Sequence, residues 1–198
     1  MTKNSEDIHW ADKAAAQVIK EKGDKKKYVL ASGITPSGII HIGNFREIIT
    51  TELVARALKK KGKEVRFIYS WDNYDAFRKV PVDMPKQEML KKYLRKPIVD
   101  IPDPFGKEES YARHNEVEVE QQIPKLGIFP EYIYQHKKYR NGDYANQIIH
   151  ALKHAKEIKQ ILDKFRDKPL EEDWLPITIF SKEDGTDKVK DLQWDGRH

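Results

Sequence analysis

Residues 28–44 read YVLASGITPSGIIHIGN, so that an apolar run leads through a glycine-containing loop directly into the start of a helix. The run at 28–31 is short and apolar, as in a buried strand. Apolar residues at helical spacing predict a helix over 41–61, and 65–69 reads as a second strand. Strand, helix and strand in this order form a βαβ unit with parallel strands and a right-handed crossover. The loop at 33–38 then lies at the carboxyl edge of the sheet, where such folds bind ligands.

Apolar spacing also predicts the other elements. The first helix is expected over 5–22, with Ser5 as its cap and Gly23 after its end. The helix at 41–61 is expected to bury Ile42, Phe45, Ile49, Leu53, Ala57 and Leu58. Further helices are expected at 86–95, 108–122 and 144–165, and strands at 132–134, 176–180 and 189–194, the last two joined by a polar turn at 183–186.

The composition excludes several classes of protein. The chain has 198 residues, 38% hydrophobic and 35% charged, and its regular apolar spacing argues against disorder throughout. It has no cysteine, which excludes disulfides, thiolate zinc sites, iron–sulfur clusters and cysteine nucleophiles. No stretch reaches the roughly 18 apolar residues of a membrane helix. The first ten residues hold no apolar signal core, so we expect a cytoplasmic protein.

The net charge allows two interpretations. There are 37 basic and 32 acidic side chains, which gives a net charge of +5. This excess is compatible with a nucleic-acid partner and equally with a soluble protein that has a lysine-rich surface. Charge alone does not choose between them.

The loop and the first helical turn carry groups suited to a nucleotide. A helix N-terminus offers unpaired N–H groups and a partial positive charge to phosphate. Gly33 and Gly38 allow a ligand to approach the backbone, and Gly43 leaves room for a flat base. His41 and Asn44 lie three residues apart, project from one side of the turn and can both hydrogen-bond phosphate oxygens. The alternative is a loop with routine turn glycines and an ordinary histidine, but the agreement of the whole string favours a nucleotide site.

Seven short stretches extend this pattern: HWAD (9–12), SGITP (32–36), PSGIIHIGN (36–44), WDNYD (71–75), FRKVP (77–81), PDPFG (102–106) and ESYA (109–112). With them the chain resembles the class I aminoacyl-tRNA synthetases, since PSGIIHIGN is similar to their HIGH signature. Within that class it is most similar to the N-terminal portion of the lysyl-tRNA synthetases of the type common in archaea. The resemblance covers nearly the whole chain and is strongest over residues 9–114. Asn44 stands at the last position of the signature, as expected in this subgroup.

The resemblance implies an α/β fold and a reaction. Residues 1–99 would form the N-terminal half of a Rossmann-like, HIGH-type nucleotide-binding domain. Residues 100–198 would form a mostly helical connective insertion that contacts the tRNA acceptor stem and ends before the second half of the catalytic domain. The reaction would join lysine to ATP, with Mg²⁺, as lysyl-adenylate and then move the lysyl group to tRNA(Lys). This is the activity of a lysine–tRNA ligase.

The resemblance also implies roles for individual residues. His41 and Asn44 would be catalytic, because they would contact the ATP phosphates as pyrophosphate leaves. The expected ATP-binding set is Pro36, Ser37, Gly38, His41, Gly43 and Asn44. The expected lysine-binding set is Gly33, Thr35, Asp72 and Tyr74. Catalysis of this kind rests on positioning and charge stabilisation, without a covalent protein nucleophile.

Side-chain charge gives a separate argument for lysine. A glutamyl-type synthetase is expected to carry an arginine in the first strand, and residues 28–31 contain none. The second strand leads into Asp72 and Asp75, whose carboxylates suit a cationic substrate. Alternatively, these aspartates cap a turn or a helix. Trp71 and Tyr74 either pack on the aliphatic stem of lysine or belong to the core.

A basic stretch gives a weaker expectation about RNA. Lys137, Lys138 and Arg140 surround Tyr139, and such a group suits contact with tRNA phosphates. A run of charge is also typical of a solvated surface. Both interpretations are compatible with these residues.

Metal binding is not expected. Some relatives carry cysteine and histidine ligands after the PDPFG stretch, where this chain keeps only Asp103 and His114. Two candidate ligands without thiolates make a weak zinc site, which we expect to have been lost. His150 and His154 have the i, i+4 spacing of some metal sites but are expected on a solvated helix face.

A second signature, of the Lys-Met-Ser-Lys-Ser type, is not found, and the nearest string at 181–185 does not match. We therefore expect the chain to be a fragment of the ligase that alone binds substrates weakly and aminoacylates poorly or not at all. Two alternatives are a non-catalytic paralogue that binds tRNA or an amino acid, and a small nucleotidyltransferase of the same HIGH superfamily. The long insertion and residues 71–75 argue against the nucleotidyltransferase.

Overall fold

The computed structural model describes residues 8–190 and 192–196. These residues form two compact units. The first unit combines the chain up to Asn73 with Ala112–Gln135, and the second combines Tyr74–Tyr111 with the chain from His136 onward. The first unit contains the predicted βαβ unit and therefore the predicted nucleotide loop.

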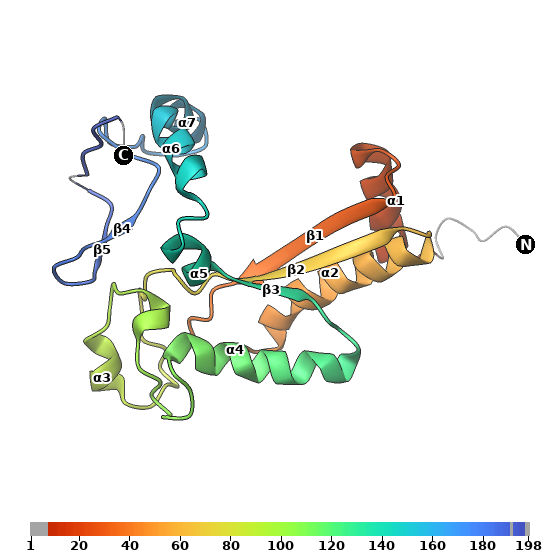
Figure 1. The fold of residues 1–198 in the computed structure, drawn as a ribbon, viewed down its shortest axis with the longest axis horizontal. Helices are drawn as coiled ribbons and strands as arrows, with labels where there is room; N and C mark the ends of the chain where they lie inside the picture. Colours follow the sequence, from red (N-terminus) through yellow and green to blue (C-terminus); the bar gives the residue numbers. More distant parts are fainter. Residues whose placement is uncertain (1–7, 191, 197–198) are drawn as a thin grey trace, which may run out of the picture. The chain divides into compact units, whose positions relative to one another are not determined.

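A parallel sheet of three strands organises the first unit (Figure 1). In spatial order the strands are β1 (Lys27–Ile34), β2 (Glu64–Trp71) and β3 (Glu131–Tyr134). Ile34 pairs with Trp71, and Trp71 pairs with Tyr134, so the three strands end at one level. The predicted parallel pair and the predicted α/β class are confirmed.

Helices α2 and α4 pack with one face of this sheet. Helix α2 (Ile42–Lys60) connects β1 to β2, while α4 (Tyr111–Gln122) and the 3₁₀ turn Ile123–Leu126 precede β3. Alternate side chains of β2 form a core with residues of these helices: Phe67, Tyr69 and Trp71 with Ile48 and Val119. Each fully buried large apolar side chain stabilises the fold by about 1.5–3 kcal/mol.

Helix α1 (Trp10–Lys22) packs against α2 through small residues. Ala11 and Ala15 are buried with Tyr28, Ala57 and Leu58 in a second core. His9 caps α1, because its Nδ1 accepts the N–H of Ala11 at 3.3 Å. The predicted cap, Ser5, lies outside the described residues.

One prediction about buried residues in α2 is wrong, and one buried residue was not predicted. Ile42 is 82% exposed, because it lies in the first turn, outside both cores. Glu52 is 6% exposed, although a charged residue is not expected in a core. It pairs with Arg56 at 2.7 Å, and Arg56 also donates to the carbonyls of Leu126 and Gly127. The ion pair thus joins α2 to the turn that precedes β3.

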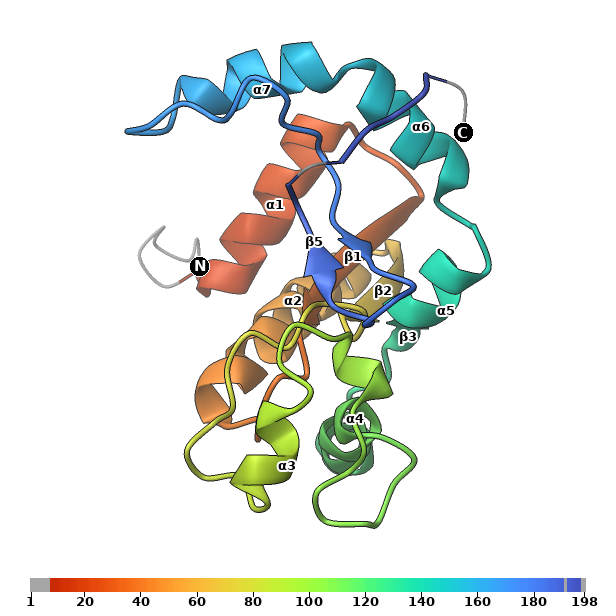
Figure 2. The same ribbon diagram turned by 90° about the vertical axis from the view of Figure 1, so that its left-hand side faces the viewer.

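The second unit consists of short elements, several of which are visible in Figure 2. They are α3 (Gln87–Lys91), the 3₁₀ turn Ile98–Asp100, α5 (Gln135–Arg140), α6 (Ala145–Lys153), α7 (Ala155–Asp163), β4 (Ile179–Phe180) and β5 (Asp187–Lys188). The first residue of α5 belongs to the first unit. Strands β4 and β5 pair in antiparallel fashion.

The predicted single helix over 144–165 is wrong. It consists of α6 and α7, which meet at His154, where φ is −107° and ψ is 22°. Buried or half-buried apolar residues occur on both sides of this point, Leu152 in α6 and Ile158 in α7. Periodicity therefore continues through the break and does not reveal it.

The predicted strand over 189–194 is also wrong. The strand that pairs with β4 is Asp187–Lys188, directly after the polar turn. The turn is closed by a hydrogen bond from the Ser181 N–H to the Thr186 carbonyl at 2.9 Å. Asp187 is held further by Arg95, whose guanidinium and carbonyl both bond to it. These contacts place the paired strand just before the apolar residues from which a strand over 189–194 was predicted.

Candidate functional site

The loop between β1 and α2 leaves the sheet at its carboxyl edge, as predicted. The Asp72 N–H donates to the Ile34 carbonyl at 3.0 Å, which extends the β1–β2 pairing by one step. Because Ile34 pairs with Trp71, the following residues, Thr35 and Asp72, leave neighbouring strands side by side. The structure thus brings together three of the four predicted lysine-binding residues: Gly33, Thr35 and Asp72.

His41 and Asn44 form a reciprocal cap at the start of α2. The His41 Nδ1 accepts the N–H of Gly43 at 3.1 Å, and the Asn44 Oδ1 accepts the N–H of His41 at 3.2 Å. Both side chains thus satisfy N–H groups that a helix start leaves without partners. Sequence spacing placed them on one turn but did not predict this mutual contact.

The cap determines which atoms of these two residues remain as donors. Because the Nδ1 of His41 is an acceptor, the proton of its neutral imidazole lies on Nε2. Asn44 uses its oxygen in the cap and keeps its amide N–H₂ for another acceptor. His41 is exposed and Asn44 half-buried. Two neutral donors therefore lie at the positive end of a helix, which is suited to a phosphate group.

Gly33 is required by the neighbouring strand. A Cβ at this position would lie 2.7 Å from the Ser70 carbonyl oxygen and 2.8 Å from the Ser70 Cβ. Gly33 and Ser70 are paired residues of β1 and β2, so the contact is part of the sheet. The neighbouring strand therefore requires a glycine here, and the ligand approach predicted at Gly33 stays a prediction.

Replacement of Gly33 by alanine should therefore destabilise the first unit by about 1–3 kcal/mol, the usual cost of overpacking. The control is Ala31→Val, which adds bulk at an exposed site two residues earlier on the same face of β1. Surface substitutions usually change stability by less than about 0.5 kcal/mol. Urea unfolding of the two variants measures the difference, and an equal effect of both would contradict this role of Gly33.

Asn115 of α4 anchors the loop between β1 and α2. Its Nδ2 donates to the Pro36 carbonyl at 3.2 Å, and both residues are buried. The next loop residue, Ser37, donates its N–H to the Thr35 carbonyl at 2.8 Å. The loop is thus tied to a helix that the sequence did not connect with it.

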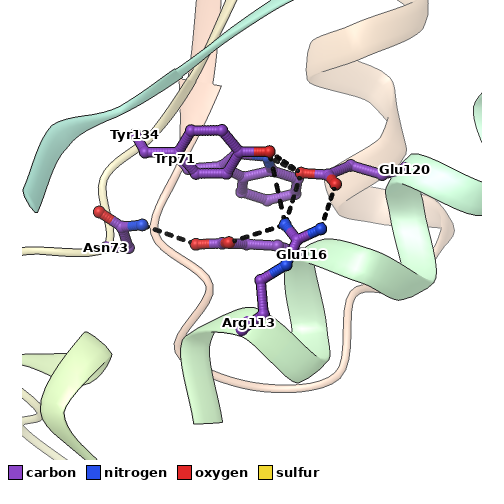
Figure 3. A network of polar contacts seen from close by, with 6 residues as sticks. All are labelled: Trp71, Asn73, Arg113, Glu116, Glu120 and Tyr134. Atoms are coloured by element: carbon purple, nitrogen blue, oxygen red, sulfur yellow. Dashed lines mark hydrogen bonds and ion pairs between the residues drawn. The ribbon is translucent and has the colours of Figure 1, made fainter. Parts of the chain in front are cut away.

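Glu120 of α4 accepts hydrogen bonds from two residues at the ends of strands and from one residue of its own helix (Figure 3). The Trp71 Nε1 and the Tyr134 hydroxyl donate to its Oε1 at 2.9 and 2.8 Å. Arg113 donates to both carboxylate oxygens, at 3.1 and 2.9 Å. One carboxylate therefore joins β2, β3 and α4.

Glu116 connects the same arginine to the residue that follows Asp72. The Asn73 Nδ2 donates to Glu116 Oε1 at 2.7 Å, and Arg113 donates to Glu116 Oε2 at 3.2 Å (Figure 3). Asn73 and Glu116 are both almost fully buried, at 0% and 2% exposure. The carboxyl edge of the sheet is therefore supported by a continuous polar network.

The network shifts the pKa values of its members. Burial raises the pKa of Glu116, although its hydrogen bonds from Asn73 and Arg113 oppose the rise. Burial and the hydrogen bond to Glu120 raise the pKa of Tyr134 to about 12, so its hydroxyl is a donor at neutral pH. Burial lowers the pKa of Arg113, but the bonds to Glu120 and Glu116 outweigh this and raise it. Arg113 therefore stays charged.

The sequence pattern did not predict this network. Arg113, Glu116 and Glu120 are spaced by three and four residues, which places them on one face of α4. Polar residues on a helix face that meets a sheet are the signal that could have revealed it. The sequence allowed Trp71 either to pack on the lysine stem or to belong to the core. In the structure Trp71 is fully buried in the core.

Asp72 accepts a hydrogen bond from a residue of strand β2. The Ser70 hydroxyl donates to Asp72 Oδ1 at 2.7 Å, and the Gln135 Nε2 donates to the Ser70 hydroxyl at 2.8 Å. Asp72 is half-buried. The carboxylate is therefore oriented by a chain of bonds that begins after β3.

Tyr74 belongs to the second unit, where it lies in an aromatic cluster. Its ring stacks on Tyr139 with centroids 5.5 Å apart, and meets Phe180 edge-on at 5.2 Å. The Arg140 guanidinium lies 5.2 Å from its centroid. The predicted contact of Tyr74 with lysine remains a prediction. Asp75 is exposed, and its carbonyl accepts the N–H of Ile98.

The predicted RNA-contacting residues lie at the end of α5, where two of them form ion pairs. Arg140 donates to both oxygens of Asp100 at 2.7 Å, and Lys138 pairs with Asp143 at 2.9 Å. Arg140 and Lys138 keep nearly half of their side-chain surface exposed.

Asp103, one of the two residues considered for zinc, has a structural role in its loop. Its carboxylate accepts the N–H groups of Phe105, Lys107 and Glu108 at 2.8–3.0 Å. His114 belongs to the other unit and is buried. Within residues 8–190 and 192–196, no group of three His, Cys, Asp or Glu side chains is arranged to hold a metal ion. Over the same residues, no helix has the length and apolar character needed to cross a membrane.

Comparison with known proteins agrees with this arrangement. A family model described as tRNA synthetases class I (K) matches residues 8–198. A lysine–tRNA ligase of Borrelia garinii is 59% identical over 172 residues, and one of Thermococcus kodakarensis is 46% identical over 193. These matches cover 87% and 96% of the chain, but 33% and 36% of the relatives. The chain thus spans about a third of their length. With its HIGH-type loop at the carboxyl edge of a parallel sheet, the chain belongs to the class I tRNA synthetase (K) family.

Proposed function

We propose that this chain is the part of a lysine–tRNA ligase that binds ATP and lysine and joins them as lysyl-adenylate. The observation that carries the proposal is the reciprocal cap of His41 and Asn44, which leaves two neutral donors at the start of α2, after a loop that leaves β1 next to Asp72. Phosphate chemistry and a cationic substrate are thus served at one edge of the sheet. The ligases to which the chain is similar support the choice of lysine.

In the proposed first step, a carboxylate oxygen of lysine attacks the α-phosphorus of ATP. The bond from that phosphorus to the bridging oxygen breaks, and pyrophosphate leaves with the negative charge. His41 donates from Nε2 and Asn44 from Nδ2 to phosphate oxygens, while Pro36, Ser37, Gly38 and Gly43 supply the surrounding backbone. Such donors lower the barrier where charge develops. Mg²⁺ comes with the nucleotide, because it prefers phosphate oxygens and water to an all-protein site.

Lysine binds with its ammonium group at Asp72 in this proposal. The Ser70 hydroxyl bond orients the carboxylate, and Gly33 and Thr35 lie beside it at the end of β1. Tyr74 would contact the aliphatic stem. A glutamate side chain would place a second negative charge against Asp72, so the site is expected to reject it.

The second step moves the lysyl group to tRNA(Lys). Residues 1–99 act as the N-terminal half of the catalytic domain, and residues 100–198 act as the connective insertion that contacts the acceptor stem. Lys137, Lys138 and Arg140 are the proposed phosphate contacts. Phosphates must replace two exposed ion pairs there, at a cost of only about 0–1 kcal/mol each.

Thermal unfolding of the 198-residue chain tests the activation proposal. Ligand that binds the folded state alone adds about 2.7 kcal/mol of stability at a concentration a hundred times its Kd. Lysine together with ATP should raise the Tm, and glutamate with ATP should give the shift of ATP alone. Asp72→Asn should remove the lysine-dependent part and keep the ATP-dependent part.

The matched control is Asp83→Asn, which neutralises an exposed aspartate of the second unit. It should keep both parts of the shift. An equal shift with lysine and glutamate would contradict the proposed substrate. Binding of tRNA without any response to ATP would favour a non-catalytic paralogue instead.

A further inference from the structure

Two lysine-rich segments lie together at the amino edge of the sheet in the first unit. They are residues 20–27, which run from the last turn of α1 into β1, and residues 59–64, which run from the end of α2 into β2. Lys27 is paired with Glu64 in the sheet, and the Glu64 N–H donates to the Lys26 carbonyl at 2.9 Å. We call these two segments the lysine rim. Figure 1 shows β1 and β2 starting at the end of the unit where α2 finishes.

The lysine rim accounts for the whole positive excess of the chain. It contains nine lysines and three acidic residues, Glu21, Asp24 and Glu64, and therefore carries a net charge of +6. The full sequence has 37 basic and 32 acidic residues. Without the rim, 28 basic and 29 acidic residues remain, which gives a net charge of −1. The rim is thus strongly basic, while the charges of the remaining sequence nearly cancel in sum.

Local structure explains only part of this charge. Lys20, Lys22, Lys59 and Lys60 lie in the last turns of α1 and α2, where a cation is favoured by the helix dipole. Each helix end carries only about −0.5 charge, so two ends offset about one charge of six. Helix capping is therefore not a sufficient reason for the cluster.

Ion pairs explain little more. Within the described residues, Lys26 pairs with Glu64 at 3.1 Å and Lys63 pairs with Asp24. The other seven rim lysines have no ion pair with a described residue, and all seven are exposed. Like charges this close repel one another and disfavour the compact state. The surface is thus suited to a polyanion that would neutralise it.

The side chains of the lysine rim identify the class of polyanion. All its cations are lysines, which contact phosphate as point charges, without the bidentate geometry of arginine. The exposed large apolar residues of the chain lie outside residues 20–27 and 59–64, so the rim has no anchor for a bilayer and no ring on which a base could stack. We propose that the lysine rim binds the phosphate backbone of RNA without reading its sequence.

This surface is separate from the proposed activation site. The eight-residue strand β1 runs from the rim to the nucleotide loop, a length of roughly 25 Å. The phosphates that the rim binds are therefore too far away to contact His41 or Asp72. The proposal holds whether or not the chain activates lysine, so the two are tested independently.

The test measures how tightly a labelled RNA duplex of arbitrary sequence binds to the 198-residue chain. Fluorescence anisotropy reports the binding, and it is measured over a range of salt concentrations. The rim variant carries Lys22→Gln, Lys25→Gln, Lys60→Gln and Lys61→Gln. The control variant removes the same charge at exposed lysines elsewhere, with Lys79→Gln, Lys92→Gln, Lys107→Gln and Lys156→Gln. Vesicles of phosphatidylserine and phosphatidylcholine form a second arm.

The rim variant should lose at least about tenfold in affinity at low salt. Its plot of log K against log salt should be shallower by up to about 3.6, because each of four lost phosphate contacts contributes about −0.9. The control variant should lose much less of both. Equal losses in the two variants would show a general charge effect and overturn the proposal. Tighter binding to the vesicles than to RNA, or no RNA binding by the unaltered chain, would overturn it as well. A Tm no lower than that of the unaltered chain would show that the rim variant is folded.

Discussion

Replacement of His41 by asparagine should reduce lysine-dependent exchange of pyrophosphate into ATP by about 10²–10³-fold, the usual loss when one donor to a developing charge is removed. The chain spans about a third of its relatives. The assay therefore uses a chimera in which it replaces the matching third of the Borrelia garinii ligase, to which it is 59% identical. Asparagine is chosen because it caps a helix well. The substitution thus removes the donor from the position of Nε2, because the amide of the shorter asparagine side chain ends closer to the backbone, and it keeps the start of α2.

His41→Ala separates the two roles of this histidine. It removes the donor and also the acceptor that bonds the Gly43 N–H, so it should cost about 1 kcal/mol of stability in addition. Both variants should lose activity alike, while His41→Ala alone has the lower Tm. If His41→Asn exchanges pyrophosphate as well as the unaltered chimera, His41 serves only as a cap. That result would favour the non-catalytic interpretation.

Replacement of Glu120 by alanine should destabilise the first unit by roughly 1.5–3 kcal/mol, the usual contribution of a hydrogen bond to a charged group, because it removes the acceptor from a half-buried ion pair. The change leaves three donors without their acceptor: Trp71 Nε1, the Tyr134 hydroxyl and the Arg113 guanidinium. Trp71 is fully buried, so its N–H has no access to water. An unsatisfied buried donor alone costs about 1–3 kcal/mol.

The control is Gln121→Ala, which shortens an exposed side chain at the next position of α4. It should change the free energy of unfolding by less than about 0.5 kcal/mol. Urea denaturation followed by tryptophan fluorescence measures both, since Trp71 lies in the network (Figure 3). A loss below about 1 kcal/mol for Glu120→Ala would show that the network adds little beyond its individual hydrogen bonds.

The family relationship supports a more specific interpretation of the site than the fold alone allows. A parallel sheet with a loop at its carboxyl edge binds many kinds of ligand. The HIGH-type string and the identity to lysine–tRNA ligases support the proposal that ATP and an amino acid are the ligands here. The capping geometry then explains how Asn44 can stand at the last position of the string: it contributes an acceptor to the helix and keeps a donor for phosphate.

The order and type of the main elements were determined by the sequence. A strand, a helix and a second strand in residues 28–69 were predicted, and so was their parallel pairing, because periodicity is local and a βαβ connection permits few topologies. The position of the loop at the carboxyl edge followed from that order. His41 and Asn44 were placed on one turn by their spacing alone.

Other features were decided only by the tertiary structure, because they depend on residues far apart in the chain. The bond from Asn115 to Pro36 spans 79 positions, and that from Trp71 to Glu120 spans 49. The exposure of Ile42 and the burial of Glu52 depend on which face of α2 meets the sheet. The lysine rim likewise forms because parallel pairing places Lys27 opposite Glu64. Local spacing carries no information about such contacts, since packing and register bring the partners together.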